Sequence, residues 1–121
     1  MKQRKTTENY LKAIYLLSRT GEVHGAQLAR YLEVSRPTVS VSLKELEAEG
    51  FLTLAPDKAI HLTALGTGVA QSTYEKNQML RDFLIRLGVS EATAAKDACE
   101  MEHAVSAESF LPLKQIMEDA T

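Results

Sequence analysis

Three residue types that bind transition metals lie close together near the end of the 121-residue chain. Cys99, Glu102 and His103 are spaced i, i+3 and i+4, so on a helix their side chains project within about 100° of one another. A thiolate, a carboxylate and an imidazole together suit Fe(II), Zn(II), Co(II) or Ni(II), and the sulfur makes the site softer than an all-oxygen Mn(II) site. The spacing makes these residues candidate ligands of one divalent metal.

The helix that must position this trio is predicted to begin at Ser90, a typical N-cap residue, and to run to about residue 105. Ala92 and Ala95 share the face of the trio, so we expect that face to turn toward the interior. A buried carboxylate such as that of Glu102 is costly unless it is paired, and a divalent metal would pair it. The pattern therefore favours a metal without requiring one.

Interpretations without a metal remain open for the same residues. Cys99 is small and apolar enough to be a core residue. Glu102 can pair with a cation such as Lys12 or Arg81, and His103 can be a hydrogen-bonded surface residue. The spacing alone does not decide between these interpretations and a metal site.

The first half of the chain shows the element order of a winged helix-turn-helix domain. Apolar spacing and cap residues predict three helices, a hairpin and a long helix that Gly88 ends. A short last helix follows Ser106, and Pro112 is expected to kink or restart it. In this domain type the second helix packs across the third and leaves one face of the third free for the DNA major groove. The expected elements span about residues 7–19, 25–31, 35–50, 51–55, 59–63, 64–87 and 90–105.

The third helix carries short polar and cationic side chains, which is typical of a DNA-reading face. Arg36 suits a guanine edge or a phosphate, and Pro37 or Thr38 can contact a thymine methyl group. Small hydroxyls let a helix approach phosphates closely, although Ser and Thr also gather at helix starts simply as caps. Lys58, at the tip of the hairpin, is expected to reach the DNA backbone. The candidate DNA-binding residues are Ser35, Arg36, Pro37, Thr38, Ser40, Ser42, Lys44 and Lys58.

The charge distribution favours an anionic partner for the first half only. Residues 1–44 contain eight cations and three anions, a net charge of +5, whereas residues 45–121 contain six cations and thirteen anions, a net charge of −7. His24 and His61 fall in the part predicted to bind DNA, and no ligand role is assigned to them. No pattern supplies a general base, a nucleophile or a phosphate-binding glycine loop, so we expect neither an enzyme nor a small-molecule substrate.

Composition is typical of a folded protein from a reducing compartment. The chain is 45% hydrophobic and 25% charged, which argues against disorder, and its single cysteine excludes an internal disulfide. No apolar run approaches the ~20 residues of a membrane span. The basic start from Met1 to Lys5 is not followed by an apolar secretory segment. We therefore expect a cytoplasmic protein without a membrane partner.

The sequence resembles the diphtheria-toxin-repressor and manganese-transport-regulator family of metal-dependent bacterial repressors from about Thr6 to Ile116. The last of three matching stretches is the most specific, because its Cys, Glu and His are metal ligands in the family. The resemblance implies one metal site made by Cys99, Glu102, His103 and Asn9. The matching stretches are Thr6-Thr7-Glu8-Asn9-Tyr10-Leu11, Ser35-Arg36-Pro37-Thr38-Val39-Ser40 and Asp97-Ala98-Cys99-Glu100-Met101-Glu102-His103-Ala104-Val105-Ser106.

Departures from the family pattern imply that a second metal site is lost. The family usually has Met or Asp where this chain has Asn9, whose carbonyl oxygen is a weaker ligand. Manganese-type members have Glu where this chain has Lys12. Most members have His at the position of Asn77 and Glu at the position of Arg81. A His or an acidic residue is often found at Ala95. Since Lys12 and Arg81 would repel a second cation, the resemblance implies a single site.

The resemblance also implies two domains and a dimer. Residues 1–70 would form the winged helix-turn-helix DNA-binding domain, and residues 71–121 the helical metal-binding and dimerisation domain. Since the chain ends at Thr121, we expect no SH3-like third domain. The second domain is too short to bury a core alone, so we expect it to pack against a second copy. The candidate dimer stripe is Val69, Thr73, Leu80, Phe83, Leu84 and Leu87, although it can instead cover the chain's own last helices.

These expectations combine into a metal-responsive repressor of double-stranded DNA. A metal that binds Asn9 together with the trio would fix the two domains relative to each other. In a homodimer this would restrict the range of distances between the two recognition helices, which must match successive major grooves of a palindromic operator. Fe(II) is favoured over Mn(II), and Zn(II), Co(II) and Ni(II) are possible. The alternative is a metal-independent winged-helix regulator that has lost the metal control of the family.

Overall fold

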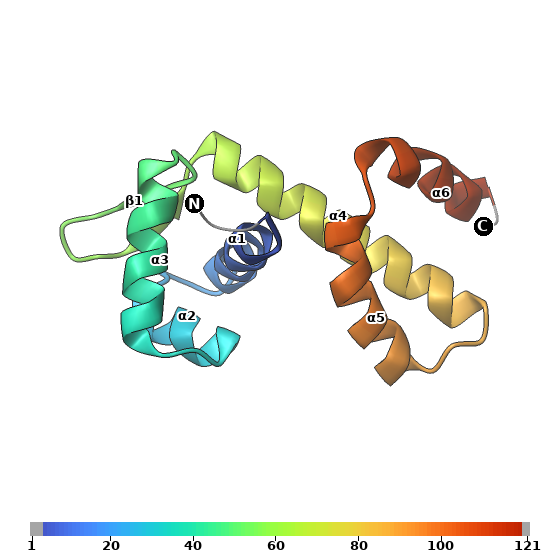
Figure 1. Cartoon of the computed structure of the whole chain (residues 1–121), viewed down its shortest axis with the longest axis horizontal. Helices are drawn as coiled ribbons and strands as arrows, with labels where there is room; N and C mark the ends of the chain where they lie inside the picture. The colour runs from blue at the N-terminus through green and yellow to red at the C-terminus, as the bar shows by residue number, and fades with distance from the viewer. Residues whose placement is uncertain (1–3, 120–121) are drawn as a thin grey trace. The chain divides into compact units, whose positions relative to one another are not determined.

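The computed structural model describes residues 4–119, which form six helices and one two-stranded sheet (Figure 1). Contacts divide the chain into two compact units, Met1–Gln71 and Ser72–Thr121. Residues 1–3 and 120–121, which the two predicted domains include, lie outside the described residues. The elements are α1 (Arg4–Ser18), α2 (Gly25–Leu32), α3 (Arg36–Ala48), β1 (Leu52–Leu54), β2 (Ile60–Leu62), α4 (Ala64–Arg86), α5 (Glu91–Ala104) and α6 (Ala107–Asp119).

The observed order confirms the predicted fold class, a mainly α chain with a winged helix-turn-helix before a helical segment. One boundary differs from expectation, and one of two alternatives for the last helix is decided. The first helix already begins at Arg4 rather than near Thr7. Pro112 lies inside α6, which continues through it to Asp119. Because proline has no N–H, α6 lacks one hydrogen bond there instead of restarting.

The helices and the hairpin of the first unit share one hydrophobic core. Ile14 of α1, Leu28 of α2 and Leu46 of α3 are at most 1% exposed. Leu52 of β1 and Ile60 of β2 close the core from the side of the hairpin. Burial of one such side chain contributes about 1.5–3 kcal/mol, so this shared core holds α3 and the hairpin against α1 and α2.

Backbone geometry fixes the turn between α2 and α3. Glu33 adopts a left-handed conformation (φ 57°), which lets the Val34 N–H donate to the Ala29 carbonyl at 3.0 Å. Ser35 then caps α3 as predicted, because its Oγ accepts the N–H of Thr38 at 3.2 Å. The turn and the cap together set the direction in which α3 leaves the core.

The hairpin is a short antiparallel pair in which Leu52 faces Leu62 and Leu54 faces Ile60. Its tip is closed by the Lys58 N–H, which donates to the Ala55 carbonyl at 2.7 Å. Lys58 has a left-handed φ of 67°, an uncommon conformation for a residue with a side chain. A further bond ties the hairpin to α3, since the Leu54 N–H donates to the carboxylate of Glu47 at 2.8 Å.

The start of α4 passes so close to the hairpin that only glycine fits. A Cβ added at Gly66 would overlap the backbone carbonyl oxygen of Phe51, which also accepts the N–H of Thr63 at 3.0 Å. We therefore expect Gly66→Ala to lower the free energy of unfolding by about 3 kcal/mol, because the obstacle is backbone and cannot rotate away. Chemical denaturation of the purified chain measures this loss.

Gly68 provides the matched control in the same helix. It is exposed, and a Cβ added there meets nothing within 4 Å. Gly68→Ala is expected to raise the free energy of unfolding by about 0.5–1 kcal/mol, because alanine favours a helix interior over glycine. Equal effects of the two substitutions would contradict the close approach at Gly66.

The second unit has a small core. Thr73 and Leu80 of α4 are nearly completely buried (3% and 2% exposed), as are Ala94 and Ala98 of α5. Two residues of the candidate dimer stripe, Thr73 and Leu80, therefore face the chain's own interior. Leu87, at the end of the stripe, is 67% exposed.

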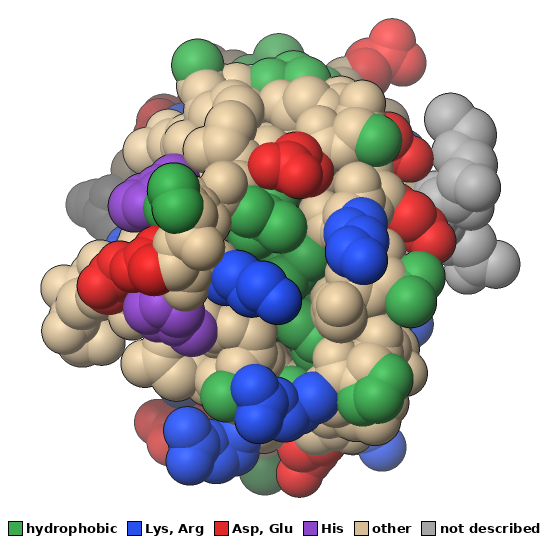
Figure 2. All heavy atoms as spheres, turned by 90° about the vertical axis from the view of Figure 1, so that its left-hand side faces the viewer, with side chains coloured by type: hydrophobic (Ala, Val, Ile, Leu, Met, Phe, Trp, Pro, Cys, Tyr) green, Lys and Arg blue, Asp and Glu red, His purple; other side chains and the backbone are tan. Residues whose placement is uncertain are grey.

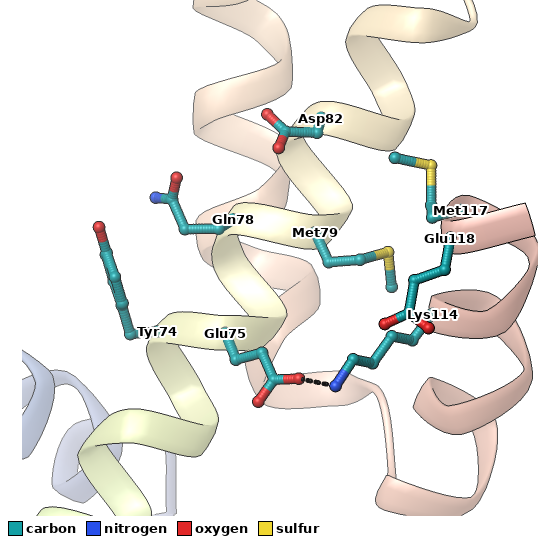
Figure 3. A pocket seen from close by; sticks show the side chains of 8 residues that line it. All are labelled: Tyr74, Glu75, Gln78, Met79, Asp82, Lys114, Met117 and Glu118. Carbon is teal, nitrogen blue, oxygen red and sulfur yellow. Dashed lines mark ion pairs between the residues drawn. The ribbon is translucent and has the colours of Figure 1, made fainter. Parts of the chain in front are cut away.

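A groove of about 500 Å³ runs between α4 and α6 within this unit (Figure 3). Figure 3 shows the side chains of Met79 and Lys114 extending toward it from the two helices. Lys114 Nζ lies 2.6 Å from Glu75 Oε1, and this hydrogen bond raises the pKa of Lys114.

None of the helices among the described residues has the length and apolar character needed to cross a membrane.

Candidate DNA interface and metal centre

The exposed face of α3 and the tip of the hairpin form a basic surface in the first unit. Figure 2 shows Lys and Arg side chains on this side of the molecule around a depression with a hydrophobic floor. Arg36, Ser40 and Lys44 of α3 line this hollow of about 360 Å³ together with Lys58. Val39 is among its apolar lining residues. The structure thus brings together four of the predicted DNA-binding residues.

A second, shallower depression lies along α3 and is lined by Pro37, Thr38, Val41 and Ser42. Val41 is 58% exposed although it is apolar. Val41 is not among the residues that the sequence predicts to bind DNA. The signal that distinguishes it is helical spacing, because Val41 is four residues from Pro37 on the outer face.

Ser42 departs from its expected place on the DNA-reading face. It is only 3% exposed and lies on the inner face of α3 with Val39, Leu43 and Leu46. The physical reason is the helical period, since Ser42 is three residues after Val39 and four before Leu46. Its side chain therefore offers little surface to a phosphate, although Ser42 lines the shallow depression beside Thr38.

Ser35 and Thr38 form a pair of hydroxyls at the start of α3. The Ser35 hydroxyl donates to Thr38 Oγ1 at 2.7 Å while it caps the helix. Ser35 therefore uses its proton within the helix start, and the Thr38 hydroxyl keeps its own proton for a phosphate oxygen. The first turn of α3 is also the positive end of its dipole, which favours an anion.

In the second unit, α5 carries the predicted metal trio with graded exposure. Glu102 is 1% exposed, the side chain of His103 is only 6% exposed, and Cys99 is exposed. His103 Nε2 lies 3.7 Å from Glu102 Oε1. The carboxylate and the imidazole are thus already neighbours, and the thiol stands at the edge of the buried face.

The buried face of α5 differs from the one expected from sequence. Ala94, Ala98 and Glu102 are buried at i, i+4 and i+8, whereas Ala92 is exposed. Cys99 and His103 form the adjacent row, also four residues apart. The expectation that Ala92 turns inward was wrong because the interior lies about 100° further around the helix. The trio therefore sits at a boundary between interior and solvent.

Asn77 of α4 joins the candidate metal centre through the thiol. Its Nδ2 donates to Cys99 Sγ at 3.7 Å, a distance within the range of hydrogen bonds to sulfur. In the sequence, Asn77 stands out only as a departure from the family pattern. No local signal could have found this contact, because the two residues are 22 positions apart in the chain. A donor to a ligating sulfur helps to orient it and tunes its basicity.

The chemistry of the donor set fits a divalent transition metal. A thiolate and an imidazole are ligands of Fe(II), Zn(II) and similar ions, and a buried carboxylate supplies negative charge where water is excluded. Cys99, Glu102 and His103 would hold the metal, with Asn77 beside the sulfur. Asn9 is half-buried on α1 in the other unit, so its part in the site stays a prediction.

Comparisons with known proteins assign both units to one family. Residues 3–60 match the family model described as iron dependent repressor, N-terminal DNA binding domain. Residues 63–121 match the model described as iron dependent repressor, metal binding and dimerisation domain. Together the two matches cover nearly the whole chain.

Individual relatives agree with these matches. The chain is 38% identical over 109 residues to the transcriptional regulator MntR of Escherichia coli O157:H7, covering 89% of this chain and 70% of that protein. It is 30% identical over 118 residues to the diphtheria toxin repressor of Corynebacterium diphtheriae, covering 96% and 52%.

Solved structures show the same fold. The manganese regulator SloR has a TM-score of 0.82 at 31% identity, covering 93% of this chain and 53% of that one. The metal-dependent transcriptional regulator MtsR has a TM-score of 0.86 at 26% identity, covering 96% and 55%. The chain thus spans about half the length of these structures and of the diphtheria toxin repressor.

Proposed function

Because this chain belongs to the iron-dependent repressor family, which includes MntR and the diphtheria toxin repressor, we propose that it represses transcription in response to a divalent metal. Members of this family are transcriptional regulators, so the chain is not an enzyme. We place its action in the cytoplasm, on double-stranded DNA. The observation that carries the metal part is the buried carboxylate of Glu102, 3.7 Å from the His103 imidazole on the helix that also carries Cys99.

On DNA, we propose that α3 enters the major groove and that the hairpin contacts the adjoining backbone. Arg36 and Lys44 supply charge toward bases and phosphates, and Pro37 with Val41 offers an apolar surface to thymine methyl groups. Lys58 approaches a phosphate from the hairpin tip. The full proposed set is Ser35, Arg36, Pro37, Thr38, Val41, Ser40, Lys44 and Lys58.

At the metal centre, we propose one site with Cys99, Glu102 and His103 as ligands and Asn9 as a fourth. Fe(II) is favoured over Mn(II) because a thiolate is softer than the oxygen ligands that Mn(II) prefers, and Zn(II), Co(II) and Ni(II) suit the same donors. Asn9 belongs to the DNA-binding unit, so a metal that binds it together with the trio would restrict the freedom of the two units. Such a restriction raises DNA affinity by population shift.

The proposed repressor is a homodimer on a palindromic operator. The second unit has a small core, and its exposed apolar residues Leu87, Leu111 and Ile116 (67%, 65% and 57% exposed) offer surface to a second copy. Two-fold symmetry would present two α3 helices about 34 Å apart, the spacing of successive major grooves.

Metal dependence of DNA binding tests this function. Operator sequences selected from a random DNA pool are expected to bind at least ten times more tightly with Fe(II), held reduced without oxygen, than with a chelator. Fluorescence anisotropy measures the affinity. Equal affinity under both conditions would favour the alternative, a metal-independent winged-helix regulator.

A further inference from the structure

We propose that Glu22, His24 and Asp57 form a second divalent-cation site, located in the first unit. Their ligand atoms, two carboxylate oxygens and an imidazole nitrogen, all lie within 4.8 Å of one another. His24 Nε2 is 3.9 Å from Asp57 Oδ2. Two ligands of one zinc ion at tetrahedral angles are about 3.4 Å apart, so small side-chain rotations would complete the geometry.

The cluster joins two segments that the fold already holds together. The buried Val23, between Glu22 and His24, accepts the N–H of Ile60 with its carbonyl at 2.8 Å. Asp57 Oδ1 accepts the N–H of Ala59 at 3.1 Å, which leaves Oδ2 toward His24. The side chains therefore converge from the α1–α2 loop and the hairpin tip. His24 and Asp57, from these two segments, are 33 positions apart in the chain.

The donor types indicate which cation fits. Two carboxylates repel each other and a cation between them removes that repulsion, so charge favours a divalent ion. An imidazole selects borderline ions such as Zn(II), Co(II) and Ni(II) over Mg(II) and Ca(II), which prefer oxygen ligands only. Three protein ligands leave positions open for water or for an anionic oxygen.

The location gives the cation a role on the basic surface. His24 and Asp57 line the same hollow as Arg36, Lys44 and Lys58. Figure 2 shows histidine and acidic side chains next to one another at the edge of this surface. A bound cation would tie the hairpin to the loop before α2 and neutralise the Asp57 carboxylate, which lines the same hollow as the lysines. This inference does not depend on metal binding at Cys99.

Zinc stoichiometry of the whole chain tests the site. Equilibrium dialysis with Zn(II) is expected to show one equivalent fewer for Glu22→Gln/Asp57→Asn and for His24→Gln than for the unmodified chain. Asp57→Asn keeps the Oδ1 that accepts the Ala59 N–H, and His24→Gln keeps the backbone N–H that donates to Gln27 Oε1 at the start of α2. His61→Gln, which removes an exposed imidazole from β2, is the matched control and should lose none.

Co(II) separates this site from the one at Cys99. A thiolate ligand gives Co(II) a charge-transfer absorption band, so the band should persist in Glu22→Gln/Asp57→Asn and vanish in Cys99→Ala. If the altered chains bind as much Zn(II) as the unmodified chain, the second site does not exist. If Cys99→Ala alone leaves both the band and the stoichiometry unchanged, the Cys99 site fails while the second site stands.

Discussion

Replacing Cys99 with alanine is expected to remove the metal response of DNA binding. Loss of an outer-shell partner alone weakens metal binding by about 10–100-fold, so the loss of a direct ligand is expected to cost at least about 100-fold. Glu102, His103 and the proposed ligand Asn9 would remain, a site without its thiolate and with only two ligands on α5. At metal concentrations that saturate the unmodified chain, such a site stays largely empty.

Glu102→Gln tests the same site without creating a cavity, because the side chains are isosteric. Glu100→Gln is its matched control, since Glu100 is an exposed acid on the same helix and the net charge changes equally. We expect Glu102→Gln to abolish the increase of DNA affinity with Fe(II) and Glu100→Gln to retain it. Anisotropy titrations of operator DNA with metal and with chelator measure both.

Metal-dependent thermal stability gives a second readout of this prediction. A ligand at 100 times its Kd stabilises the folded chain by about 2.7 kcal/mol, so the unmodified chain should melt at a higher temperature with metal. Cys99→Ala is expected to lose at least part of that shift. A variant that keeps the full affinity increase on DNA would rule out Cys99 as a ligand that controls binding.

The fold could be predicted largely because its signals are local. Ser35 and Ser90 cap helices through bonds to residues three positions ahead, and Gly88 ends α4 with a left-handed φ of 98°. Such signals depend on neighbours in the chain, which the sequence displays directly. The turn at Pro56-Asp57-Lys58 was predictable for the same reason.

Side-chain placement was harder to predict because burial depends on which neighbours cover a helix. On α3 the polar Ser42 is buried and the apolar Val41 is exposed, the reverse of what polarity alone predicts. The reason is that Val39 and Leu46 define the inner face of the helix, and Ser42 lies on that face. Polarity describes a preference for solvent, and the helical period decides where each residue actually points.

The long-range contacts of the candidate sites could not be predicted from the sequence. The contact between Asn77 and Cys99 and the convergence of His24 with Asp57 join residues that are far apart in the chain. Neither pair has a characteristic spacing, so only the packing of α4 with α5, and of the hairpin with the α1–α2 loop, reveals them. The trio on α5 was predictable because its residues lie on a single helix.

Arg36→Ala is expected to weaken operator binding by at least about 30-fold. A good guanidinium contact to a base is worth about 1–3 kcal/mol, and a homodimer would lose it twice. Arg36 is exposed on α3 and lines the basic hollow beside Lys44 and Lys58. Arg86→Ala, which removes the same charge from an exposed position at the end of α4, is the control and should change affinity little.

Salt dependence and an unrelated DNA duplex then show what Arg36 contacts. If Arg36 reads a guanine edge, Arg36→Ala lowers affinity for the operator far more than for the unrelated duplex. If it binds a phosphate, affinity falls equally on both duplexes and the slope of log K against log salt decreases by about one for each copy. Operator affinity that falls no further than in Arg86→Ala would mean that the exposed face of α3 is not the surface that reads DNA.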